Sequence, residues 1–142
     1  MPMPMPMPMP LPKPGDLTSL VLRTHFGDEA AWDALRSAID GATFVSDRRF
    51  AEADVQALAD AAAAAEEREW FNHLFIADAT AMADPDHPLL AVDLWVEPGR
   101  TFRVPARWFF DVSANLGLAN MYFEEFAEAA DASGTFQGFG PH

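Results

Sequence analysis

The sequence predicts an α/β or α+β domain in which a mixed sheet is flanked by helices. Short apolar runs of strand length recur at 20–22, 44–45 and 74–77, and stretches with apolar residues at helical spacing separate them. Further on, apolar residues alternate over 90–96, and after a turn the segment 101–104 can return antiparallel. The predicted order is therefore strand, helix, strand, helix, strand, β-hairpin and C-terminal helix.

Two helices are predicted in the first half of the chain. Asp28 can accept the free amides at the start of the first helix, in which Trp32, Leu35 and Ile39 repeat at helical spacing. The second is a long alanine-rich helix over 53–70, with apolar residues on one face and acidic residues on the other. Each helix follows a predicted strand and precedes the next one.

The second half of the chain begins with a loop and contains the hairpin turn. Two prolines forbid regular structure over 83–88, and Pro98-Gly99 suits a tight turn with glycine in the left-handed conformation. A cluster of aromatic residues at 108–110 leads into a stretch of small residues. In the last helix, Phe123 and Phe126 belong to the stripe that faces the core.

The first residues differ in composition from the rest. Residues 1–10 are five Met-Pro pairs, and the pattern continues to Pro14. Proline fixes φ and lacks a backbone donor, so this segment is predicted to be a disordered, extended arm over 1–14. The remaining residues, 15–142, have the size of a single domain.

The charge of the chain limits the partners that it can bind. The sequence has 22 acidic and 9 basic side chains, a net charge of -13, 50% hydrophobic residues and no cysteine. An acidic surface repels phosphate backbones and anionic lipids, so we expect neither a nucleic acid nor a membrane as partner. Without cysteine, thiolate zinc sites and cysteine nucleophiles are excluded, and a cytoplasmic location is expected.

Signatures of catalysis are missing from the sequence. The four histidines, at 25, 73, 87 and 142, are not paired at ligand spacing. The sequence contains no nucleophile elbow, no phosphate-binding glycine loop and no dinucleotide fingerprint. We therefore favour a protein without catalytic residues and expect no cofactor.

One group of residues could hold a hard cation. Carboxylate oxygens that follow strand ends are suitable ligands for magnesium or calcium. The alternative is that these residues are ordinary turn formers, since they lack the spacing of a calcium loop. The candidate metal residues are Asp78, Asp84, Asp86, His87 and Asp93.

Asp93 also needs a structural explanation. Its place in the alternation puts the carboxylate on a strand face that should be at least half covered. A buried carboxylate requires a partner or a proton. We expect it to pair with Arg100 or Arg103 across the hairpin, or to lie on the exposed face of an edge strand.

Two further sets of residues are candidates for contact with a partner. The segment 98–110 contains arginines and aromatic residues but no acid, a composition found in interface hot spots; its candidates are Arg100, Arg103, Arg107 and Trp108. The alternative is that these arginines neutralise neighbouring carboxylates. The acidic face of the last helix, with Glu124, Glu125 and Glu128, could steer a basic partner.

The back half of the chain resembles a known family. The strings that carry the resemblance are ADPDHPLLAVDL at 83–94, EPGRTFRV at 97–104 and LANMYFEEF at 118–126. They are similar to small acidic actinobacterial domains of unknown function, and the resemblance covers about residues 11–139. It implies no activity. In composition alone, the chain is also similar to the barstar type of ribonuclease inhibitor and to bacterial immunity proteins.

These observations lead to two main hypotheses. The first is a non-catalytic protein-protein interaction module, of the immunity or inhibitor type, that binds a basic protein. The alternative is a small metal-dependent hydrolase that uses Asp78, His87 and Asp93. A third possibility, an acidic mimic of nucleic acid, requires carboxylates spaced along one ridge. The oligomeric state stays open.

Overall fold

The computed structural model describes residues 19–39, 41–64, 73–95, 97–117 and 123–137. Three predictions fall outside these residues. They are the Met-Pro arm, the continuation of the second helix to residue 70, and the strand position of Val96.

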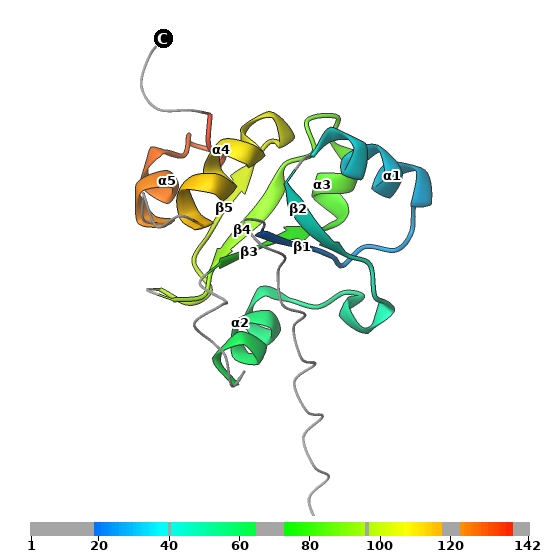
Figure 1. Cartoon of the computed structure of the whole chain (residues 1–142), viewed down its shortest axis with the longest axis horizontal. Coiled ribbons are helices and arrows are strands. Elements are labelled where there is room, and N and C mark those ends of the chain that lie inside the picture. The colour runs from blue at the N-terminus through cyan, green and yellow to red at the C-terminus, as the bar shows by residue number, and fades with distance from the viewer. Residues whose placement is uncertain (1–18, 40, 65–72, 96, 118–122, 138–142) are drawn as a thin grey trace, which may run out of the picture.

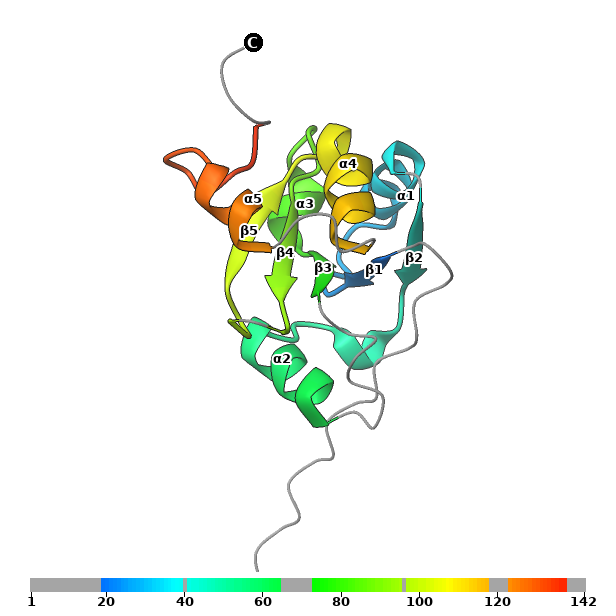
Figure 2. The same cartoon turned by 60° about the vertical axis from the view of Figure 1, so that its left-hand side comes forward.

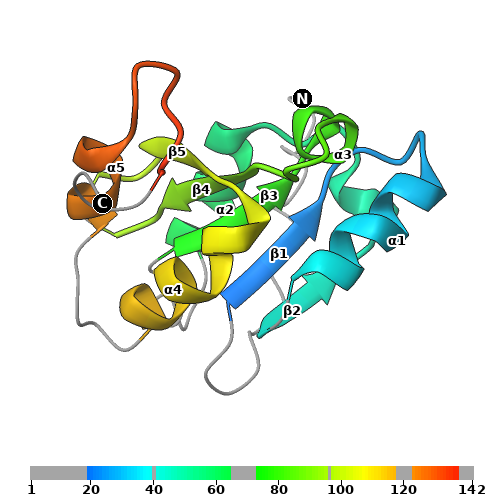
Figure 3. The same ribbon diagram turned by 90° about the horizontal axis from the view of Figure 1, so that it is seen from above.

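The described strands form one mixed sheet, in the order β2-β1-β3-β4-β5 (Figure 3). β1 runs parallel to β2 and to β3, whereas β4 is antiparallel to both of its neighbours. The strands are β1 (Ser19–Arg23), β2 (Ala42–Val45), β3 (His73–Ala77), β4 (Leu89–Asp93) and β5 (Thr101–Val104).

Helices cover both faces of this sheet (Figures 1 and 2). Among the α-helices that the structure describes, α1, α3, α4 and α5 lie on one face and α2 lies on the other. The mixed α/β or α+β architecture predicted from the sequence is thus confirmed. The helices are α1 (Glu29–Ala38), α2 (Val55–Ala64), α3 (Ala79–Ala83), α4 (Ala106–Gly117) and α5 (Phe123–Ala129), with a short 3-10 turn η1 (Arg48–Phe50) before α2.

Local chemistry explains where several elements begin and end. The Asp28 side chain accepts a hydrogen bond from the Ala31 amide at 2.9 Å and caps α1, as predicted. All five residues of β1 are buried, because helices pack on both faces of this strand. Gly99 has a φ of 97°, the left-handed conformation expected at the hairpin turn.

The structure departs from the predicted elements in three places. α3 occupies Ala79–Ala83, a segment for which the sequence predicts no element before the loop that begins at residue 83. α4 occupies Ala106–Gly117, a segment that showed only a cluster of aromatic and small residues. β4 ends at Asp93, so Trp95 belongs to the hairpin turn and is 54% exposed.

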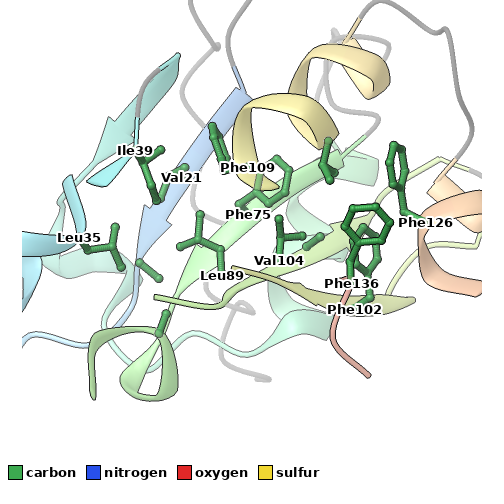
Figure 4. Close-up of a cluster of buried hydrophobic side chains, with 14 of the residues drawn as sticks. Val21, Leu35, Ile39, Phe75, Leu89, Phe102, Val104, Phe109, Phe126 and Phe136 are labelled. Carbon is green, nitrogen blue, oxygen red and sulfur yellow. The ribbon is translucent and has the colours of Figure 1, made fainter. Parts of the chain in front are cut away.

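Two apolar cores lie on the two faces of the sheet. The larger one joins the sheet to α1, α3, α4 and α5, and Figure 4 shows its aromatic side chains. Phe109 of α4 contacts Phe75 of β3 with ring centroids 4.8 Å apart, and Phe102, Phe126 and Phe136 pack together beneath α5. The smaller core joins the sheet to α2.

The C-terminal segment covers the outer side of β5. The Arg103 amide donates to the Gly134 carbonyl and the Phe136 amide donates to the Arg103 carbonyl, both at 2.8 Å. Thr135 forms a parallel bridge with Arg103. Phe136 of this segment is buried in the larger core.

The strand order creates a topological switch point at the carboxyl ends of the parallel strands. The connection from β1 to β2 passes through α1 on one face, and the connection from β2 to β3 passes through α2 on the other. The chain therefore leaves the carboxyl ends of the neighbouring parallel strands β1 and β2 towards opposite faces of the sheet. Open α/β sheets commonly bind ligands at such a switch point.

Candidate functional site

Arg103 and Asp78 form a two-pronged ion pair near the carboxyl end of β3. The two terminal guanidinium nitrogens of Arg103 donate to the two Asp78 oxygens at 2.9 and 2.8 Å, and one of them also donates to the Pro88 carbonyl. Asp78 additionally caps α3 by accepting from the Ala81 amide at 3.0 Å. The pair therefore links β5 to the start of α3. Both side chains are mostly buried.

The other members of the predicted arginine and aromatic set each have their own partner. These contacts neutralise the two guanidinium charges and pack the indole ring against the larger core. The indole Nε1 is buried without a hydrogen-bond partner within the described structure. The partners are Glu97 for Arg100, Asp86 and Gln137 for Arg107, and Phe136 for Trp108.

The five candidate metal residues do not meet at one place. Asp93 is the last residue of β4 and lies opposite His73, the first residue of β3, so it is at the other end of the strands from Asp78. Across the residues that the structure describes, no three acidic or histidine side chains are grouped so that they could hold a metal ion. The residues predicted for a hydrolase therefore do not share a site.

Backbone contacts account for the remaining candidate metal residues. The Asp84 carboxylate accepts from the Asp86 amide at 2.9 Å, and His87 Nδ1 donates to the Ala81 carbonyl at 3.0 Å. Asp86 also approaches Arg107 at 3.7 Å. This is the turn chemistry that the sequence offered as the alternative to metal binding.

Asp93 is buried and stabilises the hairpin turn. Its two carboxylate oxygens accept from the amides of Trp95 at 2.9 Å and Glu97 at 3.0 Å. Only 3% of the residue is exposed, and β4 is an interior strand, so the expected exposed edge position is wrong. The arginines proposed as partners pair elsewhere, Arg100 with Glu97 and Arg103 with Asp78.

Replacing Asp93 with alanine should destabilise the fold by about 2 to 4 kcal/mol, because the amides of Trp95 and Glu97 lose a buried acceptor. Asp93→Asn retains one oxygen acceptor and should lose less. Urea unfolding of both variants at neutral pH measures the difference. Equal losses in the two variants would contradict the role that we assign to the carboxylate.

A second polar centre lies at the amino ends of β1 and β3. Ser19 Oγ is 2.7 Å from His73 Nε2 and 2.7 Å from Ser113 Oγ of α4. Burial lowers the pKa of His73 to about 4, and the Asp93 carboxylate opposes part of this shift. His73 is therefore neutral at physiological pH.

This serine and histidine centre is a structural link between α4 and the sheet. A serine nucleophile must be reached by its substrate, but Ser19 and Ser113 are only 3% and 6% exposed. The short contacts instead satisfy polar groups that α4 buries against β1 and β3. Sequence reasoning missed the centre because Ser19, His73 and Ser113 are far apart along the chain.

A third polar centre surrounds Arg23 at the carboxyl end of β1. Its side chain is only 2% exposed, yet it forms a two-pronged pair with Glu29, whose side chain is 68% exposed. The Arg23 guanidinium lowers the pKa of the Glu29 carboxyl. The guanidinium carbon also lies 4.4 Å from the centre of the Phe26 ring and 5.2 Å from that of the Trp32 ring.

The sequence held one signal for this centre. Arg23 directly follows a run of buried apolar residues, which is an unusual place for an arginine unless it is paired. The signal becomes informative only when the strand order shows that Arg23 lies at the switch point.

The exposed charge of the molecule is acidic. Every arginine in the described residues except Arg48 forms an ion pair with a carboxylate. Glu124, Glu125 and Glu128 are exposed on α5, while Phe123 and Phe126 of the same helix are buried, as predicted. The described arginines other than Arg48 are therefore paired within the domain, and the three glutamates of α5 face solvent.

The comparison with protein families agrees with the resemblance noted in the sequence. The family model described as Domain of unknown function (DUF6924) matches residues 18–139. The chain belongs to this family. No curated protein matches it. In the described part of this DUF6924 domain, none of the helices has both the length and the apolar character needed to cross a membrane.

Proposed function

We propose that this DUF6924 domain is a non-catalytic, cytoplasmic protein that binds a basic protein partner through its acidic surface. The observation that carries the proposal is the unequal pairing of charges. The arginines that the structure describes are used in ion pairs within the domain, with Arg48 as the exception. With 22 acidic against 9 basic side chains in the chain, the outward field is negative.

The acidic face of α5 is the best candidate for the contact surface. Phe123 and Phe126 anchor the helix in the larger core, so its backbone is held before a partner arrives. Glu124 and Glu128 then present carboxylates from consecutive turns on the solvent side. A charged face that is already ordered accelerates association with a basic partner and costs little further ordering.

The proposal predicts that charge reversal on α5 weakens binding of a cationic probe. We expect Glu124→Lys combined with Glu128→Lys to reduce the affinity for a fluorescent oligolysine peptide by about tenfold at low salt. Fluorescence anisotropy at low and at physiological ionic strength measures the affinity. Salt should reduce the difference between the variant and the natural chain, because it screens exposed charges.

A matched control separates a local site from net charge. Asp60→Lys combined with Asp111→Lys produces the same change in charge at exposed positions of α2 and α4. This control should weaken peptide binding clearly less than the α5 variant does. Equal effects of the two variants, or peptide binding without salt dependence, would refute the α5 surface.

A further inference from the structure

The Arg23 centre holds a buried cation against an exposed counter-ion. Arg23 donates from its two terminal nitrogens to the two Glu29 oxygens at 3.1 and 2.9 Å, and from Nε to the His25 carbonyl at 2.9 Å. One terminal nitrogen also donates to Ser46 Oγ at 3.3 Å. The guanidinium is thus fixed in orientation, whereas Glu29 is mostly in solvent and has room to turn away when another anion takes its place beside Arg23.

Arg48 places a second positive charge beside the Phe26 ring. Its guanidinium carbon lies 5.2 Å from the centre of the Phe26 ring, the ring that Arg23 also contacts. Within the described residues Arg48 has no ion pair, in contrast to the neighbouring Arg49, which pairs with Asp47 at 2.9 Å. In a chain with a net charge of -13, an arginine without a carboxylate partner is unexpected.

Glu29 therefore balances only part of the local positive charge. It supplies one negative charge beside Arg23. Arg23 chiefly, and Arg48 to a smaller extent, lower the pKa of its carboxyl. Asp33, which is itself paired with Arg36, raises this pKa. Ser46 contributes a hydroxyl from the end of β2. A group with two negative charges and several acceptor oxygens would complement these donors better than one carboxylate does.

The position of the centre agrees with ligand binding. Arg23 ends β1 and Ser46 follows β2, so both lie at the carboxyl ends of parallel strands. This is the edge at which the α1 and α2 connections leave the sheet on opposite faces. Ligands of open α/β sheets bind at this edge.

We propose that the Arg23 centre binds the phosphate group of a small molecule, which takes the place of the Glu29 carboxylate. The phosphate oxygens accept from the Arg23 fork, the Ser46 hydroxyl and Arg48. Displaced Glu29 turns into solvent, where it is already largely exposed. The site does not depend on the acidic face of α5, so failure of either proposal leaves the other standing.

Titration with inorganic phosphate tests the proposal. We expect saturable binding by calorimetry at constant ionic strength, at a pH where phosphate is mostly dianionic and with chloride as the comparison anion. Arg48→Gln should weaken phosphate binding about tenfold, because it removes a charged donor. Glu29→Gln should strengthen it about fivefold, because the competing carboxylate charge is lost.

Arg49→Gln is the matched control. It removes the same charge from the residue next to Arg48, and the Arg49 side chain is already paired with Asp47. This variant should bind phosphate as the natural chain does. Equal effects of Arg48→Gln and Arg49→Gln would overturn the proposal, since they would indicate only a change in net charge. Heat of binding no larger than that of chloride, in both the natural chain and Glu29→Gln, would also overturn it.

Ribose 5-phosphate distinguishes the source of the phosphate group. If ribose 5-phosphate binds more tightly than inorganic phosphate, and the variants rank in the same order of affinity, the result supports a phosphorylated metabolite as ligand. Weaker binding with the same order supports free phosphate. If the three variants do not show the expected ranking of affinities with either ligand, the Arg23 centre is not the site.

Discussion

Acidification should destabilise the domain through His73, by up to about 3 kcal/mol between pH 6.5 and pH 4. The pKa of His73 is lowered from 6.5 to about 4 because the ring is buried. As the pH falls through this window, the unfolded chain takes up a proton on His73 while the folded protein does not. The proton stabilises the unfolded state, so stability is complete above pH 6.5 and is lost progressively below it.

Urea unfolding at a series of pH values measures this dependence. His73→Gln removes the titrating group but can retain a nitrogen near Ser19, and it should flatten the pH dependence within the window. His87→Gln is the control, because His87 precedes β4 at the other end of the strands from His73 and contacts the Ala81 carbonyl. An equally steep loss of stability in His73→Gln would show that other groups cause it. A direct NMR titration of His73 should give a midpoint near 4.

Replacing Asp78 with alanine should destabilise the fold by about 2 to 4 kcal/mol. The change removes the helix cap of α3 and leaves Arg103 mostly buried without its carboxylate partner. Asp86→Ala is the matched control, because its pair with Arg107 spans 3.7 Å between exposed side chains and should contribute less than about 1 kcal/mol. Thermal and urea unfolding compare the two variants.

A double variant assigns the loss to the ion pair. Adding Arg103→Met to Asp78→Ala removes the unpaired charge and should recover part of the stability. The part that is not recovered reports the cap of α3 and the contact with Pro88. If Asp78→Ala were no more harmful than Asp86→Ala, the pair could not be the link between β5 and α3.

The strands could be predicted from sequence because burial leaves a local pattern. The run Leu20–Leu22 is apolar throughout, since α1 and α2 cover both faces of β1. The alternation around Val92 is equally direct, because Leu90 and Val92 face the α2 side while Ala91 belongs to the larger core. Both patterns arise because helices cover the faces of a strand, and this coverage determines which positions are apolar. The strands can therefore be predicted without knowledge of which helix covers them.

Two helices left a weaker pattern. α3 has only five residues, and its alanine-rich sequence showed no amphipathic repeat, so the Asp78 cap was its main signal. In α4 the apolar residues at 108–110 are consecutive, which obscures the helical spacing. Only the packing shows that Phe109 is buried while Phe110 is 63% exposed.

The polar centres could not be derived from the chain alone. Ser19 and His73 meet because β1 and β3 are neighbours in a parallel register, which the strand order decides. Asp93 was recognised as unusual, but its partners are backbone amides, and no side chain in the sequence indicates them. Arg23 required both its burial and its place at the switch point before it could be interpreted.

The contact between β5 and the C-terminal segment limits how a partner can bind. The amide and the carbonyl of Arg103 are already bonded to Gly134 and Phe136. A peptide strand that approached from this side would have to displace a segment held in the core by the Phe136 ring. The sheet therefore cannot be lengthened at β5 by simple strand addition, which also protects it from edge-to-edge aggregation. Under the proposed function, a partner on this flank would therefore contact side chains, such as the carboxylates of α5, and not the backbone of β5.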